Sequence, residues 1–237
     1  MAHLSRIASP KLWNIPRKGR KWITRTSPGP HSLGSSINLS ILLKYILGYS
    51  NSQRDVKEII NNGDIKVDSK IRKDYHFAVG LMDTISFDKL NENYRVLLNK
   101  KGKIILTKIS KEESIKKPFK ILTKTLLKNK KMQLNLSNGK NILVDKDSYK
   151  VSDTLIMDLL TNKIVDHLPL KEGSIIYLTG GSKIGHVGKV VSITKANGTQ
   201  QSKILFTLDK TKNETLKEYA FVIGDDKSVI TTPENES

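Results

Sequence analysis

The sequence predicts an α+β chain of several small domains, with little helix and many short strands. Three observations lead to this prediction. Apolar residues recur at helical spacing chiefly between residues 37 and 60. Further along, short apolar segments alternate with Gly, Asn and Asp turns, as in β-hairpins. Residues 1–36 hold four of the seven prolines and no acidic residue, so we expect no continuous helix there.

These patterns divide the 237 residues into five consecutive parts. We expect an extended basic arm at 1–36, a small helix-helix-strand domain at 37–93 and a β-rich central domain at 94–170. A small all-β domain follows at 171–224, and an acidic flexible tail at 225–237. The length suits such a division, since single domains take ~100–200 residues or fewer.

Two helices are expected in the second part. Residues 37–49 carry Leu and Ile at helical spacing, and the pattern closes near Gly48. The next helix begins at Ser52, which forms an S-x-x-D capping signature with Asp55. Gly63 supplies a left-handed stop, and strands follow it.

The remaining elements are mostly strands. Turns at Asp68-Ser69 and near Gly80 separate short strands, and residues 94–109 form a hairpin. Ser110 and Glu113 cap a short helix that Pro118 ends. Further strands are expected at 154–159, 163–167, 174–179, 186–194, 203–208 and 219–223.

Residues 119–128 fit two structures. Their lysines recur every four residues, as on a helix face, while Phe, Ile, Thr and Leu alternate as in a strand. The β-branched content and the hairpin that follows favour a strand. That hairpin is MQLNLSNGKNILV, in which Asn138-Gly139 indicates a type I′ turn.

The charge is distributed very unevenly. The formal net charge is +18, and residues 1–131 hold 28 Lys+Arg against 10 Asp+Glu, whereas residues 132–237 hold 13 of each. Residues 1–54 contain no acid. Such crowding of like charge costs self-repulsion that a polyanion would offset, so we expect nucleic acid as the partner. An anionic membrane is the second candidate partner. Binding to a membrane surface requires an amphipathic helix, and the prolines exclude a continuous helix in this segment.

The N-terminal segment has two further interpretations. It is Arg-containing, Ser-containing and acid-free, like a mitochondrial transit peptide, but its prolines and its two tryptophans argue against one. Extended basic arms with aromatic residues can thread between phosphates and stack on bases. Alternatively, Trp13 and Trp22 simply pack onto the next domain.

Several kinds of site are excluded or unsupported. The absence of cysteine excludes disulfides, thiolate zinc sites, iron–sulfur clusters and a cysteine nucleophile. The five histidines show no i, i+4 metal spacing, and neither a G-x-S-x-G nor a dinucleotide-binding motif occurs. No apolar run approaches the ~18 residues of a membrane span, and the N-terminus lacks the apolar core of a secretory signal. We therefore expect no catalytic residues, metal or cofactor.

The segment GSIIYLTGGSKIGHVGKVVSI, residues 173–193, contains a glycine-rich turn between two strands. A phosphate-binding P-loop needs Ser or Thr after Gly-Lys and a helix next, whereas Gly188-Lys189 precedes Val190 and a strand. The segment resembles instead the KOW motif, a β-turn-β element of small barrels in ribosomal and transcription-elongation proteins. That resemblance makes Gly188 the key glycine and places Lys183 and Lys189 on the exposed turn, where we expect both to contact RNA. A plain glycine-rich hairpin remains the alternative.

The stretch RDVKEIINNGDIKVDSKIRKD resembles the small RNA-binding domain called the S-four domain. In that family the second helix and the following turn lie on RNA. The family usually has Gly after the turn Asp, where this chain has Ser69. Any one of the matching cations could be merely a solvated charge, but together they suggest an RNA-binding cluster. They are Arg54, Lys57, Lys66, Lys70, Arg72 and Lys73.

Collinear motifs extend the resemblance over residues 1–224. HLSRIASPKLW, SPGPHSLG, VGLMDTISF, NENYRVLLNKKGK, QLNLSNGKNILV, YLTGGSKIGHVGKV and FVIG resemble the archaeal and eukaryotic S-four-e family of small-subunit ribosomal proteins. The resemblance implies an S-four domain, a β-rich central domain and a KOW-type β-barrel. The chain departs from the family pattern at Asn162, His186 and Val187.

The same resemblance implies a structural, non-enzymatic protein of cytoplasmic ribosomes. Its partners would be the ribosomal RNA of the small subunit and neighbouring ribosomal proteins, with no cofactor, no membrane and no obligate homo-oligomer. We expect the arm to become ordered only on RNA, so that deleting residues 1–30 weakens assembly without unfolding the rest. The expected contacts in the arm are Arg6, Lys11, Arg17, Lys18, Arg20, Lys21 and Arg25.

Two other functions remain open from the sequence. One is an RNA-modifying enzyme that carries an S-four domain, although no catalytic constellation accompanies it here. The other is a transcription-elongation regulator, which the KOW element alone suggests but which leaves the basic arm unexplained.

Overall fold

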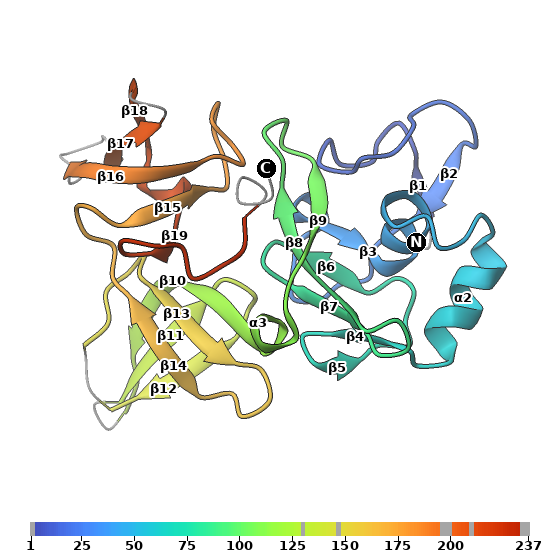
Figure 1. Ribbon diagram of the computed structural model, residues 1–237, viewed down its shortest axis with the longest axis horizontal. Coiled ribbons are helices and arrows are strands. Elements are labelled where there is room, and N and C mark those ends of the chain that lie inside the picture. The colour runs from blue at the N-terminus through green and yellow to red at the C-terminus, as the bar shows by residue number, and fades with distance from the viewer. Residues whose placement is uncertain (1–2, 129–130, 146–147, 195–200, 209–210, 233–237) are drawn as a thin grey trace. The chain divides into compact units, whose positions relative to one another are not determined.

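The computed structural model describes residues 3–128, 131–145, 148–194, 201–208 and 211–232. Strands predominate in these ranges, and helices are few and short (Figure 1). The chain forms two compact units. The first comprises residues 1–98 and 103–117, and the second comprises residues 99–102 and 118–237. The predicted predominance of β structure is confirmed.

The first unit is built on a five-stranded antiparallel sheet in the order β5-β4-β7-β8-β9. A second pair, β3 with β6, lies in the same unit. The predicted hairpin is confirmed as β8 and β9, but it continues the sheet of the first unit, so the expected boundary after residue 93 falls inside β8. The strands are β3 (Ser36–Asn38), β4 (Ile65–Val67), β5 (Lys70–Ile71), β6 (Ala78–Gly80), β7 (Thr84–Phe87), β8 (Glu92–Leu98) and β9 (Ile104–Lys108).

Short helices accompany this sheet. They are α1 (Leu39–Ile41), the π-helical turn η2 (Leu42–Ile46), α2 (Gln53–Asn61) and α3 (Lys111–Ile115), with a 3₁₀ turn η1 (Leu33–Ser35) before β3. The first predicted helix starts two residues late, because Ile37 and Asn38 pair with β6. The side chain of Asn38 then caps the helix by accepting from the Ile41 N–H at 2.8 Å.

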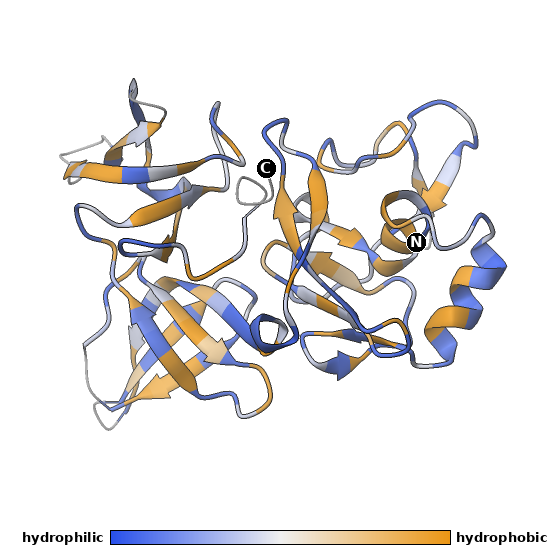
Figure 2. Cartoon of the chain, in the orientation of Figure 1, coloured by the Kyte–Doolittle hydropathy of each residue, from blue (hydrophilic) through white to orange (hydrophobic). Residues whose placement is uncertain are grey.

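Helix α2 shows why these residues form a helix. Ser52 caps it by accepting from the Arg54 N–H at 3.1 Å. Val56 and Ile60 are fully buried, whereas Arg54 and Lys57 are exposed. Figure 2 shows this division of the helix into a hydrophobic and a hydrophilic side. The predicted capping residue is confirmed.

The turn between β4 and β5 forms without glycine. Asp68 has φ 52° and Ser69 has φ 61°, so both adopt the left-handed conformation that glycine tolerates best. Ser69 therefore accepts the strain that the family's usual glycine avoids. Asn162, the other position where a turn glycine is common, also has a left-handed φ of 54°.

Residues 3–36 are more folded than the extended arm that the sequence analysis expected. Strand β1 (His3–Ser5) pairs with β2 (Trp22–Thr24). Trp13 is fully buried, and its indole N–H donates to the carbonyl of Ser36 at 2.6 Å. The physical reason is that burying an indole, with its N–H bonded, stabilises a folded arm even where prolines exclude a helix.

The second unit contains a five-stranded sheet in the order β12-β11-β10-β13-β14. The ambiguous segment is a strand, as predicted, because Phe119 and Ile121 face a core with Leu134 and Leu155. Gly139 has φ 70° but Asn138 is not left-handed, so the predicted type I′ turn is wrong. The strands are β10 (Lys116–Leu126), β11 (Met132–Leu136), β12 (Asn141–Val144), β13 (Thr154–Asp158) and β14 (Ile164–Leu168).

A further five-stranded sheet of the second unit has the order β18-β17-β16-β15-β19. Its core contains Ile176, Val190, Phe206 and Val222. Strand β18 was not predicted, because its sequence TKNETL lacks an apolar alternation. The strands are β15 (Ile175–Leu178), β16 (Val187–Thr194), β17 (Lys203–Leu208), β18 (Thr211–Leu216) and β19 (Ala220–Gly224), with a 3₁₀ turn η4 (Lys217–Tyr219) before β19.

The C-terminal end of the chain differs from expectation. Within the acidic tail, Ile230 is buried and the Val229 N–H donates to the carbonyl of Ile223 at 2.9 Å, so the tail is held to the fold at these two residues. Residues 233–237 lie outside the described part. No helix in the described ranges is long and apolar enough to cross a bilayer.

Candidate RNA-binding surface

The cations predicted as contacts in the N-terminal segment fall into two groups. Lys11, Lys18, Arg20 and Lys21 are exposed, and Arg25 is partly exposed. Their charges face solvent, where a phosphate can reach them. Arg6 and Arg17 have a different role.

Arg6 is 5% exposed, and its guanidinium holds the segment together. It donates to the carbonyls of Arg20 at 2.9 Å and Pro16 at 3.0 Å, and to the hydroxyl of Tyr45 at 3.1 Å. Arg17 likewise donates to the carbonyls of Ser9 at 2.7 Å and Pro10 at 2.9 Å. Both side chains therefore organise the N-terminal segment, and RNA contacts at Arg6 and Arg17 stay predictions.

The predicted cluster around α2 also divides. Arg54, Lys57, Lys70 and Lys73 are exposed. Lys66 instead forms an ion pair with Asp88 at 2.6 Å, and the guanidinium of Arg72 lies 4.3 Å from the centre of the Phe77 ring. Four members are thus exposed, while Lys66 and Arg72 are partly buried against other groups of the protein.

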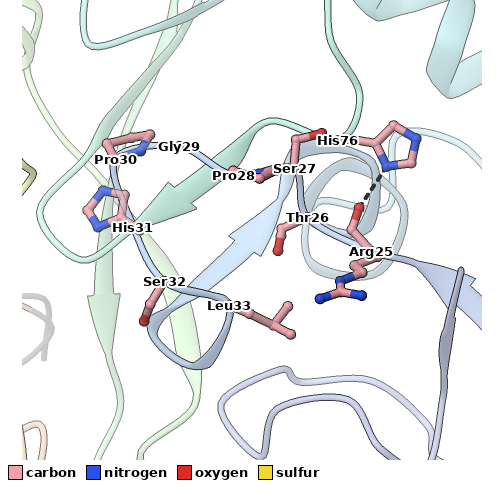
Figure 3. Close-up of a pocket in the computed structure, with 10 residues that line it drawn as sticks. All are labelled: Arg25, Thr26, Ser27, Pro28, Gly29, Pro30, His31, Ser32, Leu33 and His76. Carbon is pink, nitrogen blue, oxygen red and sulfur yellow. Dashed lines mark hydrogen bonds between the residues drawn. The ribbon is translucent and has the colours of Figure 1, made fainter. Parts of the chain in front are cut away.

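A hollow of about 810 Å³ has Arg25 in its lining. Figure 3 shows the segment from Arg25 to Leu33 bending back on itself around it. His76 closes one side, and its ring nitrogen Nδ1 lies 2.7 Å from the carbonyl of Arg25. The lining combines imidazole, guanidinium and hydroxyl groups, which suit a ribose-phosphate backbone. The residues are Arg25, Thr26, Ser27, Pro28, Gly29, Pro30, His31, Ser32, Leu33 and His76.

A buried charge network anchors His31 in the wall of this hollow. Asp83 lies 2.9 Å from His31 Nε2, and it accepts from Lys117 Nζ at 2.6 Å and from the Gly80 N–H at 2.9 Å. Lys117 also donates to Asp68 at 2.5 Å. Burial by itself would raise the pKa of Asp83, but Lys117 and His31 lower it to about 2. The carboxylate of Asp83 is therefore ionised. It links His31 in the wall of the hollow to Gly80 on β6 and to Lys117 on β10.

The same network raises the pKa of Lys117, whereas it lowers that of Asp83. Burial favours its neutral form, but the charges of Asp83 and Asp68 outweigh burial and raise its pKa. Both partners are thus charged in the folded state, although the ammonium of Lys117 is fully buried.

The remaining predicted cations lie in the second unit. Lys183 is exposed in the turn between β15 and β16, and Lys189 is exposed on β16. Lys189 Nζ lies 3.9 Å from a carboxylate oxygen of Asp226, a distance at which an exposed pair contributes little. Both remain accessible to an anion.

Sequence reasoning missed several residues that line surface hollows of the first unit. Lys44, Tyr45, Gln53 and Tyr75 line a second hollow beside the first. No motif singled them out, because they lie on η2, α2 and the loop before β6 and meet only in the folded unit. Among the described residues, no group of three or more His, Asp or Glu side chains is arranged to hold a metal ion.

Comparison with known families gives two matches along the chain. A sequence model of the ribosomal family S4e matches residues 90–164, and a model of the RS4NT (NUC023) domain matches residues 2–34. The small ribosomal subunit protein eS4 of Methanosphaera stadtmanae is 42% identical over 228 residues, which span 96% of this chain and 94% of that protein. The eS4 protein of Methanococcus aeolicus is 39% identical over 236 residues, which span 96% of each.

Solved structures agree with these matches. The crystal structure of the 30S ribosomal protein S4e from Thermoplasma acidophilum resembles this fold with a TM-score of 0.71 and 30% sequence identity. The match covers 81% of this chain and 96% of that one. Because the homology extends over nearly the full length of both sequences and includes the fold, the chain belongs to the ribosomal family S4e.

Proposed function

We propose that the protein is a structural constituent of the small ribosomal subunit and binds ribosomal RNA there. The observation that carries this proposal is the identity of 42% with a small ribosomal subunit protein over 96% of the chain. Its partners are ribosomal RNA and neighbouring ribosomal proteins, and its location is the cytoplasmic ribosome. The family is structural, so the protein is not an enzyme.

The mechanism is electrostatic. Exposed lysines and arginines neutralise RNA phosphates, and the counterions released from the RNA favour binding. Four further cations contact other groups of the protein and so fix the shape of this surface. They are Arg6, Arg17, Lys66 and Arg72. The residues proposed to touch RNA are Lys11, Lys18, Arg20, Lys21, Arg25, Arg54, Lys57, Lys70, Lys73, Lys183 and Lys189.

A three-part organisation of the folded chain goes with this function. Residues 37–93 contribute an S-four-like domain whose sheet is completed by β8 and β9. The central sheet of β10 to β14 forms the second part, and the β15 to β19 sheet closes as a KOW-type barrel. Lys183 then lies on the RNA-facing turn of that barrel, and Lys189 lies on the strand that follows this turn.

A transcription-elongation role is the remaining alternative, and it rests on the KOW-like segment alone. The match to ribosomal relatives covers the N-terminal segment and the S-four-like domain as well. Those parts include the exposed cations of the N-terminal segment and of α2, which the KOW-like segment leaves unexplained, so the ribosomal function explains more of the chain.

Gradient sedimentation tests the proposal. We expect the full-length protein to migrate with small subunits at low salt and to leave them in molar KCl. Changing Lys18, Arg20 and Lys21 together to Gln should reduce the slope of log affinity against log salt by about 2 for isolated ribosomal RNA, at ~0.7–0.9 per contact.

The control changes Lys150, Lys163 and Lys212 to Gln, which removes the same charge from exposed positions of the electrically neutral half. It should leave the slope unchanged. Equal effects of the two triple variants would show that only net charge matters, and migration with polymerase instead of subunits would overturn the proposal.

A further inference from the structure

We infer that the second hollow of the first unit receives a single unstacked nucleobase of the bound RNA strand. This inference rests on the proposed function and adds a base contact to a phosphate-binding surface. The hollow measures about 280 Å³. Its lining contains three aromatic rings and four cationic side chains but no carboxylate: Arg6, Arg20, Trp22, Ile23, Thr24, Ser40, Ile41, Lys44, Tyr45, Gln53, Lys57, Tyr75 and His76.

The aromatic rings are accessible in a way that packing does not explain. Trp22 is 55% exposed, whereas Trp13, the other tryptophan of the chain, is fully buried. Tyr45 and Tyr75 are partly exposed. Aromatic faces held at the surface are the platforms on which single-stranded bases stack.

Each ring has a cation close to its face. Lys21 Nζ lies 5.1 Å from the centre of the Trp22 ring, and Lys57 Nζ lies 4.7 Å from that of Tyr75. Lys44 Nζ lies 5.7 Å from the centre of the Tyr45 ring. A base that stacks on a ring therefore brings its own phosphate within reach of an ammonium group, which a purely apolar ligand would not use.

The hollow is built before any ligand arrives. Arg6 donates to the Tyr45 hydroxyl and lies 5.6 Å from the centre of its ring, which holds that ring in place. Asn38 donates to the carbonyl of Thr24 at 2.7 Å and so fixes β2 against the start of α1. Because these groups are already ordered, binding costs little further conformational entropy.

One polar side chain is oriented for a base edge. Gln53 Oε1 accepts from Ser40 Oγ at 2.9 Å, which sets the direction of the amide. In the part of the chain that the structure describes, nothing accepts from the Gln53 Nε2 group. An amide in this position can donate to a ring nitrogen or carbonyl of a base.

The occupant must be single-stranded. Bases in a duplex are stacked and paired, so their faces cannot reach Trp22 or Tyr75. The neighbouring hollow of Figure 3 shares His76 with this one. An RNA strand can therefore place one base in the second hollow while its backbone continues past Arg25. A free nucleotide would use the same chemistry without the continuing strand.

Binding of labelled RNA decamers to the full-length protein, followed by fluorescence anisotropy, tests the inference. One probe is single-stranded RNA of mixed sequence, and the second has the same length and charge but abasic sugars. Changing Trp22 to Ala should weaken binding of the first about 10-fold, within the range known for one stacked base, and leave the abasic probe unaffected. Trp22→Phe should restore most of the affinity.

The matched control is Leu90→Ala, because Leu90 is also 55% exposed in the same unit but does not line the hollow. A melting curve of each variant establishes that the fold is retained. Quenching of tryptophan fluorescence in the wild type by the mixed-sequence probe, but not by the abasic one, would support stacking on Trp22.

The outcomes separate this inference from the proposed function. Equal affinity of the wild type for both probes, with steep salt dependence, would overturn the base site and leave ribosomal RNA binding intact. An equal loss on both probes in Trp22→Ala would also overturn it. Absence of any RNA or subunit binding by the wild type would overturn the proposed function itself. Mononucleotide binding as tight as that of the decamer would overturn the strand as occupant.

Discussion

Asp83 joins three segments that lie far apart in the sequence. It accepts from Lys117 and from the Gly80 N–H, and it meets His31 at the wall of the larger hollow. Its side chain is 1% exposed and that of Lys117 is fully buried. Two buried opposite charges gain little over apolar residues, but removing Asp83 leaves the buried ammonium of Lys117 with the carboxylate of Asp68 in place of two carboxylates.

Changing Asp83 to Asn should therefore destabilise the first unit by about 3–5 kcal/mol, since Lys117 would keep its charge in a buried place. Denaturant unfolding measures this loss. Asp88→Asn is the control, because Asp88 pairs with Lys66 at an exposed position where such pairs contribute below about 1 kcal/mol. A loss of under 1 kcal/mol in Asp83→Asn would contradict the stabilising role of the network.

The same carboxylate predicts a pH dependence with a definite sign. The pKa of Asp83 in the folded protein is about 2, below the ~3.9 of an unfolded Asp. Its contribution to the free energy of unfolding is therefore complete above about pH 4. The contribution is lost as the pH falls from about 4 to 2. The difference in unfolding free energy between the wild type and Asp83→Asn should shrink over that window. A difference that stays constant would indicate that Asp83 titrates normally.

For single residues, the sequence predicted that the cations of the arm matter more reliably than it predicted what each cation contacts. The arm cations were predicted from their crowding, and Lys18, Arg20 and Lys21 are indeed exposed. Arg6 has the same charge and lies in the same arm, yet its donors meet protein carbonyls. Charge patterns do not contain the distance to an acceptor, so they could not separate the two.

Strands β16 and β17 show how one glycine fits an element into its sheet. A Cβ on Gly188 would lie 2.7 Å from Cδ2 of Phe206 and 3.1 Å from the carbonyl oxygen of Thr207. Phe206 is fully buried, so its ring has little space to move. The glycine that marks the KOW-like segment lies within β16 and is thus needed for packing.

Changing Gly188 to Ala should destabilise the second unit by about 1–3 kcal/mol, the usual cost of overpacking a core. Thermal or denaturant unfolding checks this. Gly34→Ala is the control, since a Cβ there meets nothing within 4 Å and its φ is not left-handed. Unchanged stability in Gly188→Ala would mean that the sheet shifts to accept the methyl group.

Element types were predicted best where local pattern and tertiary environment agree. Helix α2 has its cap and its apolar stripe in the sequence itself. Strand β18 has neither, and it forms because β17 offers it hydrogen-bonding partners along its whole length. The turn after β11 depends on the backbone of Asn138, which its dipeptide pattern predicted wrongly.

Over the whole molecule, the N-terminal segment is basic and free of acidic residues, and it is also a part of the folded first unit. Trp13 is buried, and the carbonyl of Leu12 accepts from the Ile104 N–H at 3.0 Å. Lys103 also donates to the carbonyl of Lys11 at 2.6 Å. These bonds join the segment to β9 and its preceding residue.

Deleting residues 1–30 should therefore destabilise the first unit, in contrast to the expectation for an extended arm. Loss of a buried tryptophan alone costs about 3–5 kcal/mol. Hydrogen exchange of the truncated protein should accelerate in β3 to β9 and stay unchanged in β15 to β19. Unchanged exchange in β3 to β9 would restore the view of the segment as an independent arm that only RNA orders.

The sequence by itself determined the family, the predominance of strands and the polyanionic partner, because collinear motifs, alternation and net charge are all written along the chain. Only the tertiary structure decided which cations are exposed and which contact other groups of the protein. It also brought Trp22, Tyr45 and Tyr75 around one hollow. Burial and distance between residues remote in sequence are set by packing, and no local pattern encodes them.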